Sequence, residues 1–243
     1  MRWRHLAAFI ASASLIACEP EPSVDHYILA LSWQPAFCAY NADKPECRAL
    51  DGGDYAATNL TLHGLWPNAA NGEHPFYCGI SDTGRSGDEA GNWCALPETG
   101  ADQATQSDLA QVMPGSMSCL DRHEWIKHGT CTGLGGDAYF DASVRLVREM
   151  QATQLSEILR ANIGQEVARR DVLAAFERDF GAGAADALEL ICRRNGGRTY
   201  LAEIRLALRR DAIGKPLSGN ALFLGGPPPH GGCPAKIYLA PAE

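Results

Sequence analysis

The stretch NLTLHGLW, residues 59–66, decides how this chain of 243 residues folds. Apolar and polar residues alternate along it, and successive side chains of a strand point to opposite faces of a sheet. His63 should therefore project from a strand, on the face opposite Leu60 and Leu62. The two expected faces are Leu60, Leu62 and Gly64 on one side and Thr61, His63 and Leu65 on the other.

Three other stretches carry the same alternation. Residues 25–35, DHYILALSWQP, predict a strand. Residues 187–194 and 199–211 flank the turn NGG and predict a β-hairpin, and residues 236–240, KIYLA, predict a last strand. The faces expected to be buried are Tyr27, Leu29, Leu31 and Trp33 in the first stretch, and Tyr200, Ala202, Ile204, Leu206 and Leu208 in the hairpin.

Helical spacing marks two segments. In residues 142–164, apolar residues recur at helical intervals after Asp141, a residue type that caps helix N-termini. A second helix spans about residues 171–180 and ends at Gly181. Residues 79–105 are rich in Gly, Asp, Ser and Thr and predict a long surface loop. Because strands and helices are interspersed and the strand connections are hairpin-like, the sequence predicts an α+β fold.

The N-terminus predicts a secretory leader. Arg2 and Arg4 precede the apolar run LAAFIASASLIA, and no segment is apolar for long enough to be a transmembrane helix of the mature chain. The run ends in LIAC, which resembles the bacterial lipobox, whose cysteine, here Cys18, is lipidated. Ordinary cleavage near Ala13 or Ala17 is the alternative. We expect a signal peptide over residues 1–17, an acidic tether over 18–25 and one folded domain over 26–243.

The cysteine count supports export. Of nine cysteines, eight remain when Cys18 is set aside, and an even number in an exported chain indicates a disulfide framework. A structural zinc site is the alternative, although no paired CxxC spacing occurs. Eight cysteines allow about a hundred pairings, so their spacing alone selects none. They are Cys38, Cys47, Cys78, Cys94, Cys119, Cys131, Cys192 and Cys233.

The chain is acidic, with a formal net charge of −8. Loss of Arg2 and Arg4 with the leader would bring it near −10. This charge disfavours non-specific attraction to nucleic acid, which usually requires a basic surface. Any recognition of nucleic acid must then depend on a local site, helped by protonation of histidines at mildly acidic pH.

A second stretch, HEWIKHGTC, spans residues 123–131 and gathers titratable groups. Zinc proteases carry two histidines four positions apart, on one helical face. Here His123 and His128 are five positions apart and would diverge by about 140° on a helix. Lys127 beside them would repel a cation. The spacing therefore disfavours a catalytic metal.

The same groups suit cleavage of an RNA phosphodiester. One imidazole can take the proton of the ribose 2′-hydroxyl while another, such as His63, protonates the departing 5′-oxygen. Lys127 and the remaining histidine can stabilise charge on the phosphoryl oxygens. A structural role is the alternative, since a histidine beside an apolar strand and a helix face with Glu, Lys and His commonly have no catalytic task.

Two motifs, HGLWP and HEWIKHGTC, resemble the active-site motifs of the ribonuclease T2 family, in its bacterial ribonuclease I-like branch. They cover fourteen positions without a gap. LSWQ, MPG and DAYF elsewhere add to a resemblance that extends over about residues 26–240. The family's fold is a central, mainly antiparallel sheet flanked by helices. Its reaction is transfer to a 2′,3′-cyclic phosphate, followed by hydrolysis to a 3′-phosphate.

The resemblance assigns a role to each charged residue of the two motifs. His63 matches the general acid and His128 the general base. His123 matches a histidine that binds the phosphate. Glu124 and Lys127 match the pair that stabilises the phosphorane-like transition state.

The resemblance also implies how a base is held. Trp66 matches an aromatic residue that stacks on a base, as is common in readers of single-stranded RNA. Some family members have an acidic residue that selects adenine where this chain has Asn68. An amide both donates and accepts hydrogen bonds, so we expect a relaxed or different base preference.

Disulfide pairing is implied in part by the resemblance. Family positions imply the bridges Cys78–Cys131 and Cys192–Cys233, and Cys38–Cys47 and Cys94–Cys119 then remain. The resemblance further implies single-stranded RNA rather than DNA as partner, no cofactor, a monomer, and a place in the periplasm or cell envelope. Two alternatives stay open: a metal-dependent hydrolase using His63, His123 and His128, and a weakly active relative that binds RNA or a partner.

Overall fold

The computed structural model describes residues 24–70, 74–225 and 232–242. No helix within these ranges has the length and apolar character needed to cross a bilayer. The predicted leader, Cys18 and most of the tether lie outside them. The strands are β1 His26–Trp33, β2 Leu60–Asn68, β3 Glu166–Ala168, β4 Leu188–Asn195, β5 Arg198–Arg209 and β6 Lys236–Tyr238. The α-helices are α1 Gln34–Cys38, α2 Pro45–Arg48, α3 Tyr55–Thr58, α4 Asp82–Glu89, α5 Gln103–Val112, α6 Leu120–Lys127, α7 Gly136–Gln151, α8 Gln154–Ala161 and α9 Arg169–Phe180.

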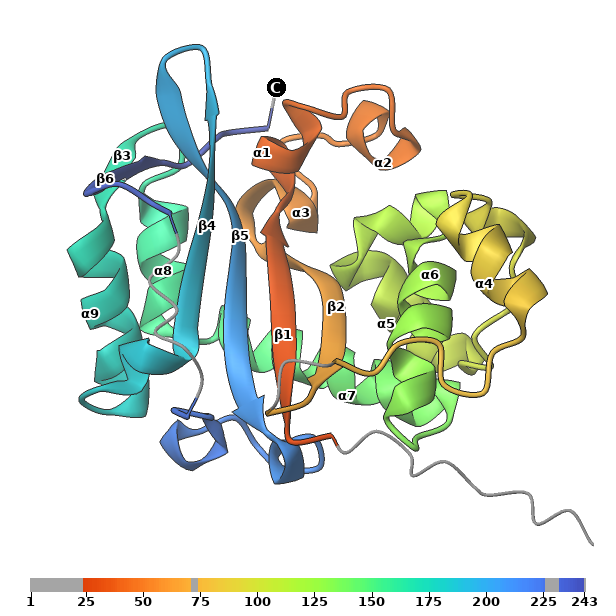
Figure 1. Ribbon diagram of the computed structural model, residues 1–243. Coiled ribbons are helices and arrows are strands. Elements are labelled where there is room, and N and C mark those ends of the chain that lie inside the picture. Colours follow the sequence, from red (N-terminus) through yellow and green to blue (C-terminus); the bar gives the residue numbers. More distant parts are fainter. Residues whose placement is uncertain (1–23, 71–73, 226–231, 243) are drawn as a thin grey trace, which may run out of the picture.

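A mainly antiparallel sheet forms the centre of the molecule, which confirms the predicted α+β class. Strands follow the order β2-β1-β5-β6-β3, β4 pairs with β5 as the predicted hairpin, and the β5–β6 contact is parallel. Figure 1 shows α8 and α9 beyond the β4 side of the sheet, and α4, α5 and α6 beyond β2. The helix α6, which carries the second motif, therefore faces the strand β2, which carries the first.

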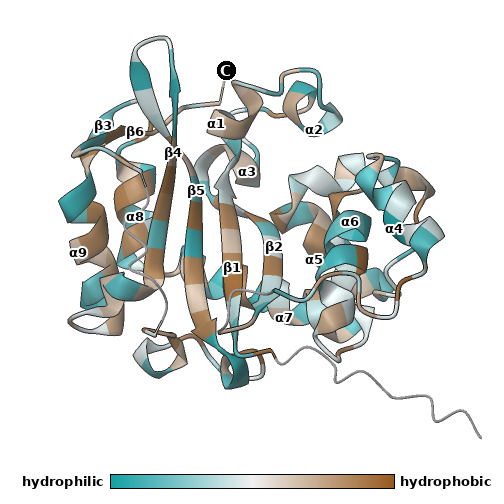
Figure 2. Cartoon of the chain, viewed as in Figure 1, coloured by the Kyte–Doolittle hydropathy of each residue, from teal (hydrophilic) through white to brown (hydrophobic). Residues whose placement is uncertain are grey.

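The core lies between the sheet and the long helix α7. Leu29, Leu31 and Leu206 on the strands and Phe140 and Leu146 on α7 have no exposed surface. In Figure 2 hydrophobic residues concentrate along β1, β4 and β5. Burial of each such side chain contributes about 1.5–3 kcal/mol. This core fixes the strands that present the first motif.

A β-bulge interrupts β2 at His63. Gly64 pairs with Ala30 and Leu62 pairs with Leu31, so His63 is one residue too many for the ladder. The expected position of His63, opposite Leu60 and Leu62, is confirmed. The positions expected for Gly64 and Leu65 were wrong, because the extra residue reverses the alternation. Leu65 is buried completely in the core, and Gly64 faces the Glu124 side chain instead of sharing a face with Leu60 and Leu62. Bulges are common beside active sites, where they re-aim a side chain.

A second bulge lies in β5. Ile191 pairs with Glu203 and Cys192 with Leu201, which leaves Ala202 unpaired. Leu201 is consequently buried, whereas Tyr200 and Ala202, expected on the buried face, are only half-buried. Beyond the bulge the predicted face is correct, with Ile204, Leu206 and Leu208 fully buried.

Two predictions for the helices were wrong. The single helix expected over residues 142–164 is two: α7 begins at Gly136, before Asp141, and Thr153 starts α8 by accepting a hydrogen bond from the Ser156 amide. The loop expected over residues 79–105 contains α4, which is capped by Ser81 and forms despite its two glycines, Gly84 and Gly87. The helix α9 ends at Gly181 as predicted.

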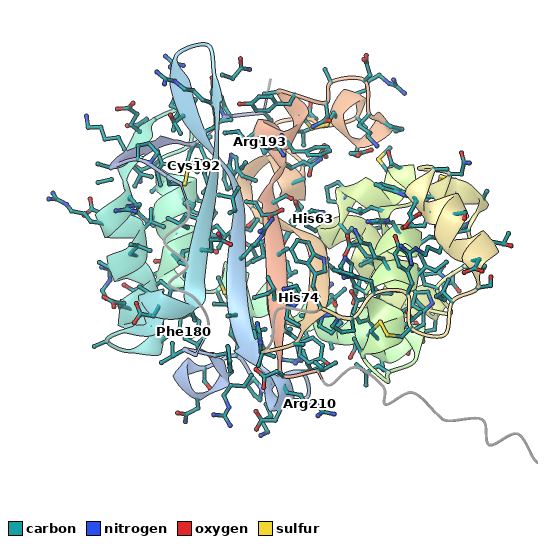
Figure 3. All side chains as sticks on the ribbon, viewed as in Figure 1. His63, His74, Phe180, Cys192, Arg193 and Arg210 are labelled. Carbon is teal, nitrogen blue, oxygen red and sulfur yellow. A yellow bond between two sulfur atoms is a disulfide. The ribbon has the colours of Figure 1, made fainter. Side chains whose placement is uncertain are left out.

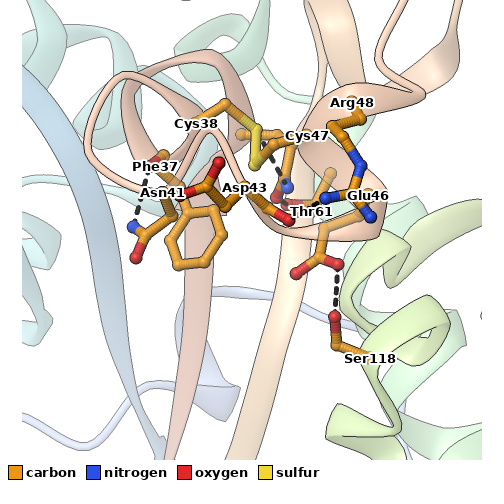
Figure 4. Close-up of a disulfide and its surroundings, with 10 residues drawn as sticks. Phe37, Cys38, Asn41, Asp43, Glu46, Cys47, Arg48, Thr61 and Ser118 are labelled. Atoms are coloured by element: carbon orange, nitrogen blue, oxygen red, sulfur yellow. Dashed lines mark hydrogen bonds between the residues drawn. A yellow bond between two sulfur atoms is a disulfide. The ribbon is translucent and has the colours of Figure 1, made fainter.

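Four disulfides staple the fold: Cys38–Cys47, Cys78–Cys131, Cys94–Cys119 and Cys192–Cys233. They are the pairs that follow from the family resemblance. Figure 4 shows the first, next to Glu46, which accepts a 2.6 Å hydrogen bond from the Ser118 hydroxyl and so joins this loop to the helices beyond β2. The domain begins earlier than expected, because Val24, assigned to the tether, is buried in the core.

Candidate active site

The helix α6 presents the second motif to the sheet. It follows Cys119, whose left-handed backbone (φ 60°) turns the chain into the helix, and it ends at Lys127. His128 is its C-cap, and the bridge from Cys131 to Cys78 follows at once. The rings of His123 and His128 lie 6.5 Å apart and nearly perpendicular. As the five-residue spacing predicted, they do not meet at one point.

Glu124 is the buried centre of the site, with 1% of its surface exposed. Its Oε1 lies 3.8 Å from Nε2 of His63 and 3.9 Å from Nε2 of His123. Its Oε2 accepts a 2.7 Å hydrogen bond from Nε1 of Trp66. Burial raises the pKa of Glu124, and the nearby histidines oppose that rise. The two motifs are thus brought together around one carboxyl group.

Gly64 makes this approach sterically feasible. A Cβ atom at this position would overlap both Oε2 of Glu124 and Nε1 of Trp66. The glycine of the first motif therefore leaves the space into which the glutamate of the second fits.

His63 is held by a carboxylate from the central strand. Its Nδ1 lies 2.6 Å from Oε2 of Glu203, and the other oxygen of Glu203 accepts a 2.6 Å hydrogen bond from Nε of Arg205. Burial opposes protonation of His63, but the hydrogen bond with Glu203 and the charges of Glu124 and Glu203 outweigh it and raise the pKa of His63. About a third of the His63 side chain, 35%, remains exposed, so a substrate can reach it.

His123 is held from the opposite side by the helix α4. Its Nδ1 lies 2.7 Å from Oδ1 of Asp88, whose second oxygen accepts a 2.8 Å hydrogen bond from the Tyr77 hydroxyl. Trp93 stacks on the imidazole at 4.5 Å between ring centroids. Both contacts fix the orientation of the ring that the family resemblance assigns to phosphate binding.

His128 lies in a different environment. It is 6% exposed, between the rings of Trp66 at 5.5 Å and Phe76 at 5.4 Å. Among the described residues, its Nδ1 has no hydrogen-bond partner. Burial, together with the positive charges of Lys127 and the other histidines, lowers the pKa of His128 to about 2. The free protein therefore keeps this imidazole neutral.

Two cavities share His63 and Arg205. The larger has a volume of about 890 Å³ and the smaller about 370 Å³. Asn68 lines the larger one, is 7% exposed, and donates a 2.9 Å hydrogen bond to the Trp66 carbonyl. Nζ of Lys127 lies 5.7 Å from the centre of the Phe76 ring at the same cavity. The larger cavity is also lined by Trp66, Phe76, His123, Glu124 and His128, and the smaller one by Lys44, Trp93, Arg193 and Glu203.

All seven predicted site residues thus lie at one place, and several functional neighbours were missed. Glu203 and Asp88 hold two of the histidines but are far from them in sequence. The sequence pattern could have indicated Glu203 and Arg205, because these charged residues alternate with the fully buried Ile204 and Leu206 on a central strand. Among the described residues, no three His, Cys, Asp or Glu groups are arranged to hold a metal ion. The metal-hydrolase alternative therefore has no ligand set in this part of the chain.

Comparison with known proteins places the chain in a family. The family model "Ribonuclease T2 family" matches residues 24–215. The chain belongs to the ribonuclease T2 family, and it is an RNA-cleaving endoribonuclease.

Among individual proteins, the chain is similar to Ribonuclease I of Escherichia coli (strain K12). The two are 36% identical over 263 aligned positions, which cover 98% of this chain and 96% of the relative. The fold is similar to that of the SF11-RNase of Nicotiana alata, with a TM-score of 0.59, 16% identity, and coverage of 90% of this chain and all of that one. It is also similar to RNase NT, crystallised with 5′-AMP, with a TM-score of 0.56, 22% identity, and coverage of 90% and 99%.

Proposed function

We propose that this protein is an exported, metal-independent endoribonuclease of single-stranded RNA. It cleaves by attack of the 2′-hydroxyl, giving a 2′,3′-cyclic phosphate and then a 3′-phosphate end. The observation that supports this best is the contrast between His63 and His128, which line the same cavity: His63 is paired with a carboxylate, and His128 is buried and neutral. A proton-transfer reaction needs one imidazole in each state.

His63 is proposed as the general acid. Its bond to Glu203 and the nearby Glu124 raise its pKa against the opposing effect of burial, so it carries a proton at neutral pH more readily than a free histidine. That proton would pass to the 5′-oxygen as it leaves the phosphorus. Glu203 also fixes the ring, because Nδ1 is committed to its carboxylate and Nε2 is left for the substrate.

His128 is proposed as the general base. An imidazole must be neutral to accept the 2′-hydroxyl proton, and burial beside Lys127 keeps it so. A pKa of about 2 describes the free enzyme and would make a weak base. A bound phosphodiester places an anion beside the ring, and this negative charge raises the pKa towards the working range.

Lys127, His123 and Glu124 are proposed to stabilise the crowded phosphorus centre. Lys127 supplies positive charge to the phosphoryl oxygens, and the His123 imidazole donates a hydrogen bond to them. Burial favours the protonated form of Glu124, and a neutral carboxyl can donate a hydrogen bond where a carboxylate would repel the phosphate. Such a carboxyl also fits the near-total burial of this side chain.

The two cavities suggest a polarity for the RNA strand. The proposed general base, His128, acts on the 2′-hydroxyl of the upstream nucleotide, and it lines the larger cavity together with Trp66 and Asn68. The nucleobase of the upstream nucleotide would therefore stack on Trp66 in the larger cavity, and Asn68 is a candidate for hydrogen bonding to its edge. The departing nucleotide would lie in the smaller cavity, which His63 lines and His128 does not.

Export and location are proposals from the N-terminal residues. A signal peptide over residues 1–17 followed by Cys18 would send the enzyme to the periplasm or cell envelope and attach it through a lipid. Four disulfides fit an oxidising compartment. Mass measurement of Cys18 in protein purified from membranes tests the lipid.

A digest of single-stranded RNA in excess EDTA tests the reaction. The oxidised mature protein is incubated at about pH 5.5 and about pH 7.5, near either side of the histidine range, and product ends are identified by mass. Cyclic phosphate ends formed in EDTA are the expected result. Cleavage that is lost in EDTA and restored by zinc would favour the metal hydrolase. RNA binding without cleavage in any condition would favour the weakly active binding protein.

A further inference from the structure

The tip of the β4–β5 hairpin is basic in an acidic protein. Arg193, Arg194 and Arg198 are exposed there, in a chain of net charge −8. Within the described ranges, none of the three forms an ion pair with an acidic side chain. We call these three residues the arginine tip. Three guanidinium groups on one short hairpin, without acidic partners in the described ranges, create a local positive field.

The arginine tip is continuous with the smaller cavity. Ile191 pairs with Glu203, the residue that holds His63, and both line that cavity. Arg193 lies two positions further along β4, or about 7 Å, and lines the same cavity. In Figure 3 Arg193 lies on the hairpin towards α1, and His63 lies further down the same sheet. Arg193 therefore lies at the cavity in which we place the departing nucleotide, and Arg194 and Arg198 follow it towards the end of the hairpin.

Aromatic rings hold two of the cations in place. The guanidinium carbon of Arg193 lies 5.9 Å from the centre of the Tyr40 ring, and that of Arg198 lies 4.6 Å from the Tyr238 ring. Tyr40 belongs to the loop closed by Cys38–Cys47. A guanidinium stacked on a ring keeps its N–H edges free for phosphate oxygens. A solvated hairpin would need no such support on two sides.

We propose that the arginine tip binds the phosphates of the RNA strand on the 3′ side of the cleaved bond. This inference rests on the proposed function, because the polarity depends on His63 as the acid. The enzyme would then act faster on strands that extend beyond the departing nucleotide than on a dinucleotide.

Chimeric oligonucleotides test this directly. Strands of about ten nucleotides, a length matched to single-strand binding sites, carry one ribonucleotide near the 5′ end or near the 3′ end and deoxynucleotides elsewhere. Only the ribonucleotide can be cleaved, so the first strand extends 3′ of the bond and the second extends 5′ of it. Each kcat/KM is divided by that of a dinucleotide, which cancels damage to the catalytic groups.

The test variant is R193Q/R194Q/R198Q, and the single variant R193Q shows how much the residue nearest the cavity contributes. We expect the kcat/KM of the 3′-extended strand relative to the dinucleotide to fall about fivefold to tenfold in the triple variant. The slope of log(kcat/KM) against log salt should also become shallower by about two. The ratio for the 5′-extended strand should change less than twofold. The variant R170Q/R210Q removes two exposed arginines elsewhere and controls for two of the three positive charges lost in the triple variant.

Four results would overturn the proposal. The first is an unchanged kcat/KM ratio for the 3′-extended strand in the triple variant, and the second is an equal fall of this ratio in R170Q/R210Q. The third is a fall of the ratio for the 5′-extended strand alone. The fourth is a triple variant that binds the strand normally but no longer binds anionic lipid vesicles. If the wild-type protein cleaves nothing, the proposed function fails separately. Binding of an all-deoxy strand, which needs no cleavage, then decides the inference by comparing the wild type with the triple variant.

Discussion

His63 and His128 are the same side chain in opposite surroundings. His63 projects from a bulge in the sheet, has about a third of its side chain exposed, and forms a hydrogen bond through Nδ1 with the Glu203 carboxylate. His128 closes a helix, is almost fully buried between two aromatic rings, and has a lysine as its neighbour. The first environment raises the pKa of the imidazole and the second lowers it. The contrast shows how a fold can shift the pKa of one residue type in opposite directions, as our proposal of an acid and a base requires.

Removal of either imidazole should have the largest effect. His63→Ala and His128→Ala should each lower kcat by about 10³-fold or more, because each removes a proton-transfer group. Single-turnover cleavage of RNA measures this, with circular dichroism to confirm folding. The two variants should differ with a substrate whose leaving group needs no proton, such as a nitrophenyl ester of a nucleoside 3′-phosphate. Only His63→Ala should recover activity, and equal recovery of both would remove the assignment.

The next largest effect should come from Gly64→Ala, which pushes the two halves of the site apart. The added methyl would overlap Glu124 and Trp66, so we expect kcat/KM to fall about 10²-fold, the loss that a 1 Å misplacement can cause. Gly87→Ala is the matched control, since its Cβ would meet only the Leu96 side chain at 3.6 Å. Full activity in Gly64→Ala would show that the close approach of the two motifs is dispensable.

Glu203→Gln should change the acid without changing the base. The amide retains a hydrogen bond but not the charge, so the pKa of His63 should fall and a smaller fraction should carry the proton at neutral pH. The alkaline limb of the pH–rate profile should therefore move to lower pH, with a loss of several-fold at about pH 7.5 and little loss at about pH 5. Glu189→Gln, which removes another carboxylate near Arg205, should leave the limb in place. A shift of the acidic limb of the pH–rate profile instead would indicate that His63 is the general base and His128 the general acid.

The bridge Cys78–Cys131 should matter least to the chemistry and most to stability. Its replacement by alanines opens a loop of 53 residues and should lower the free energy of unfolding by about 4 kcal/mol. Loss of Cys38–Cys47, with a separation of 9, should cost about 2.5 kcal/mol. Denaturant unfolding measures both. Activity of the first variant well below its melting temperature should stay within tenfold of wild type, and a larger loss would mean that the bridge positions His128.

Much of this architecture could be predicted because it depends on local patterns. The alternation in residues 25–35 gave a strand that buries Tyr27, Leu29, Leu31 and Trp33 as expected. Two motifs with matching spacing identified the three side chains nearest the Glu124 carboxyl, which are His63, Trp66 and His123. Capping by Gly181 also follows from one residue and its neighbours.

The failures have a common cause, which is that the deciding partner is distant or small. A bulge is one unpaired residue, and the bulge at His63 was enough to move the Leu65 side chain to the buried face of the sheet. Thr153 breaks a helix by a single cap, although the hydrophobic spacing continues through it. Glu203 is 140 positions from His63, so no reading of either stretch alone could join them.

The bulge in β2 also bears on insertions and deletions. Without His63, the residues from Leu60 to Trp66 would alternate regularly against β1, because the pairs on both sides already keep their partners. A chain shortened by this one residue would keep its core pairs and lose the side chain that we propose as proton donor. The proposed general acid is thus an insertion in an otherwise regular ladder, and on that proposal deletion of a single codon should yield a folded protein that binds RNA without cleaving it.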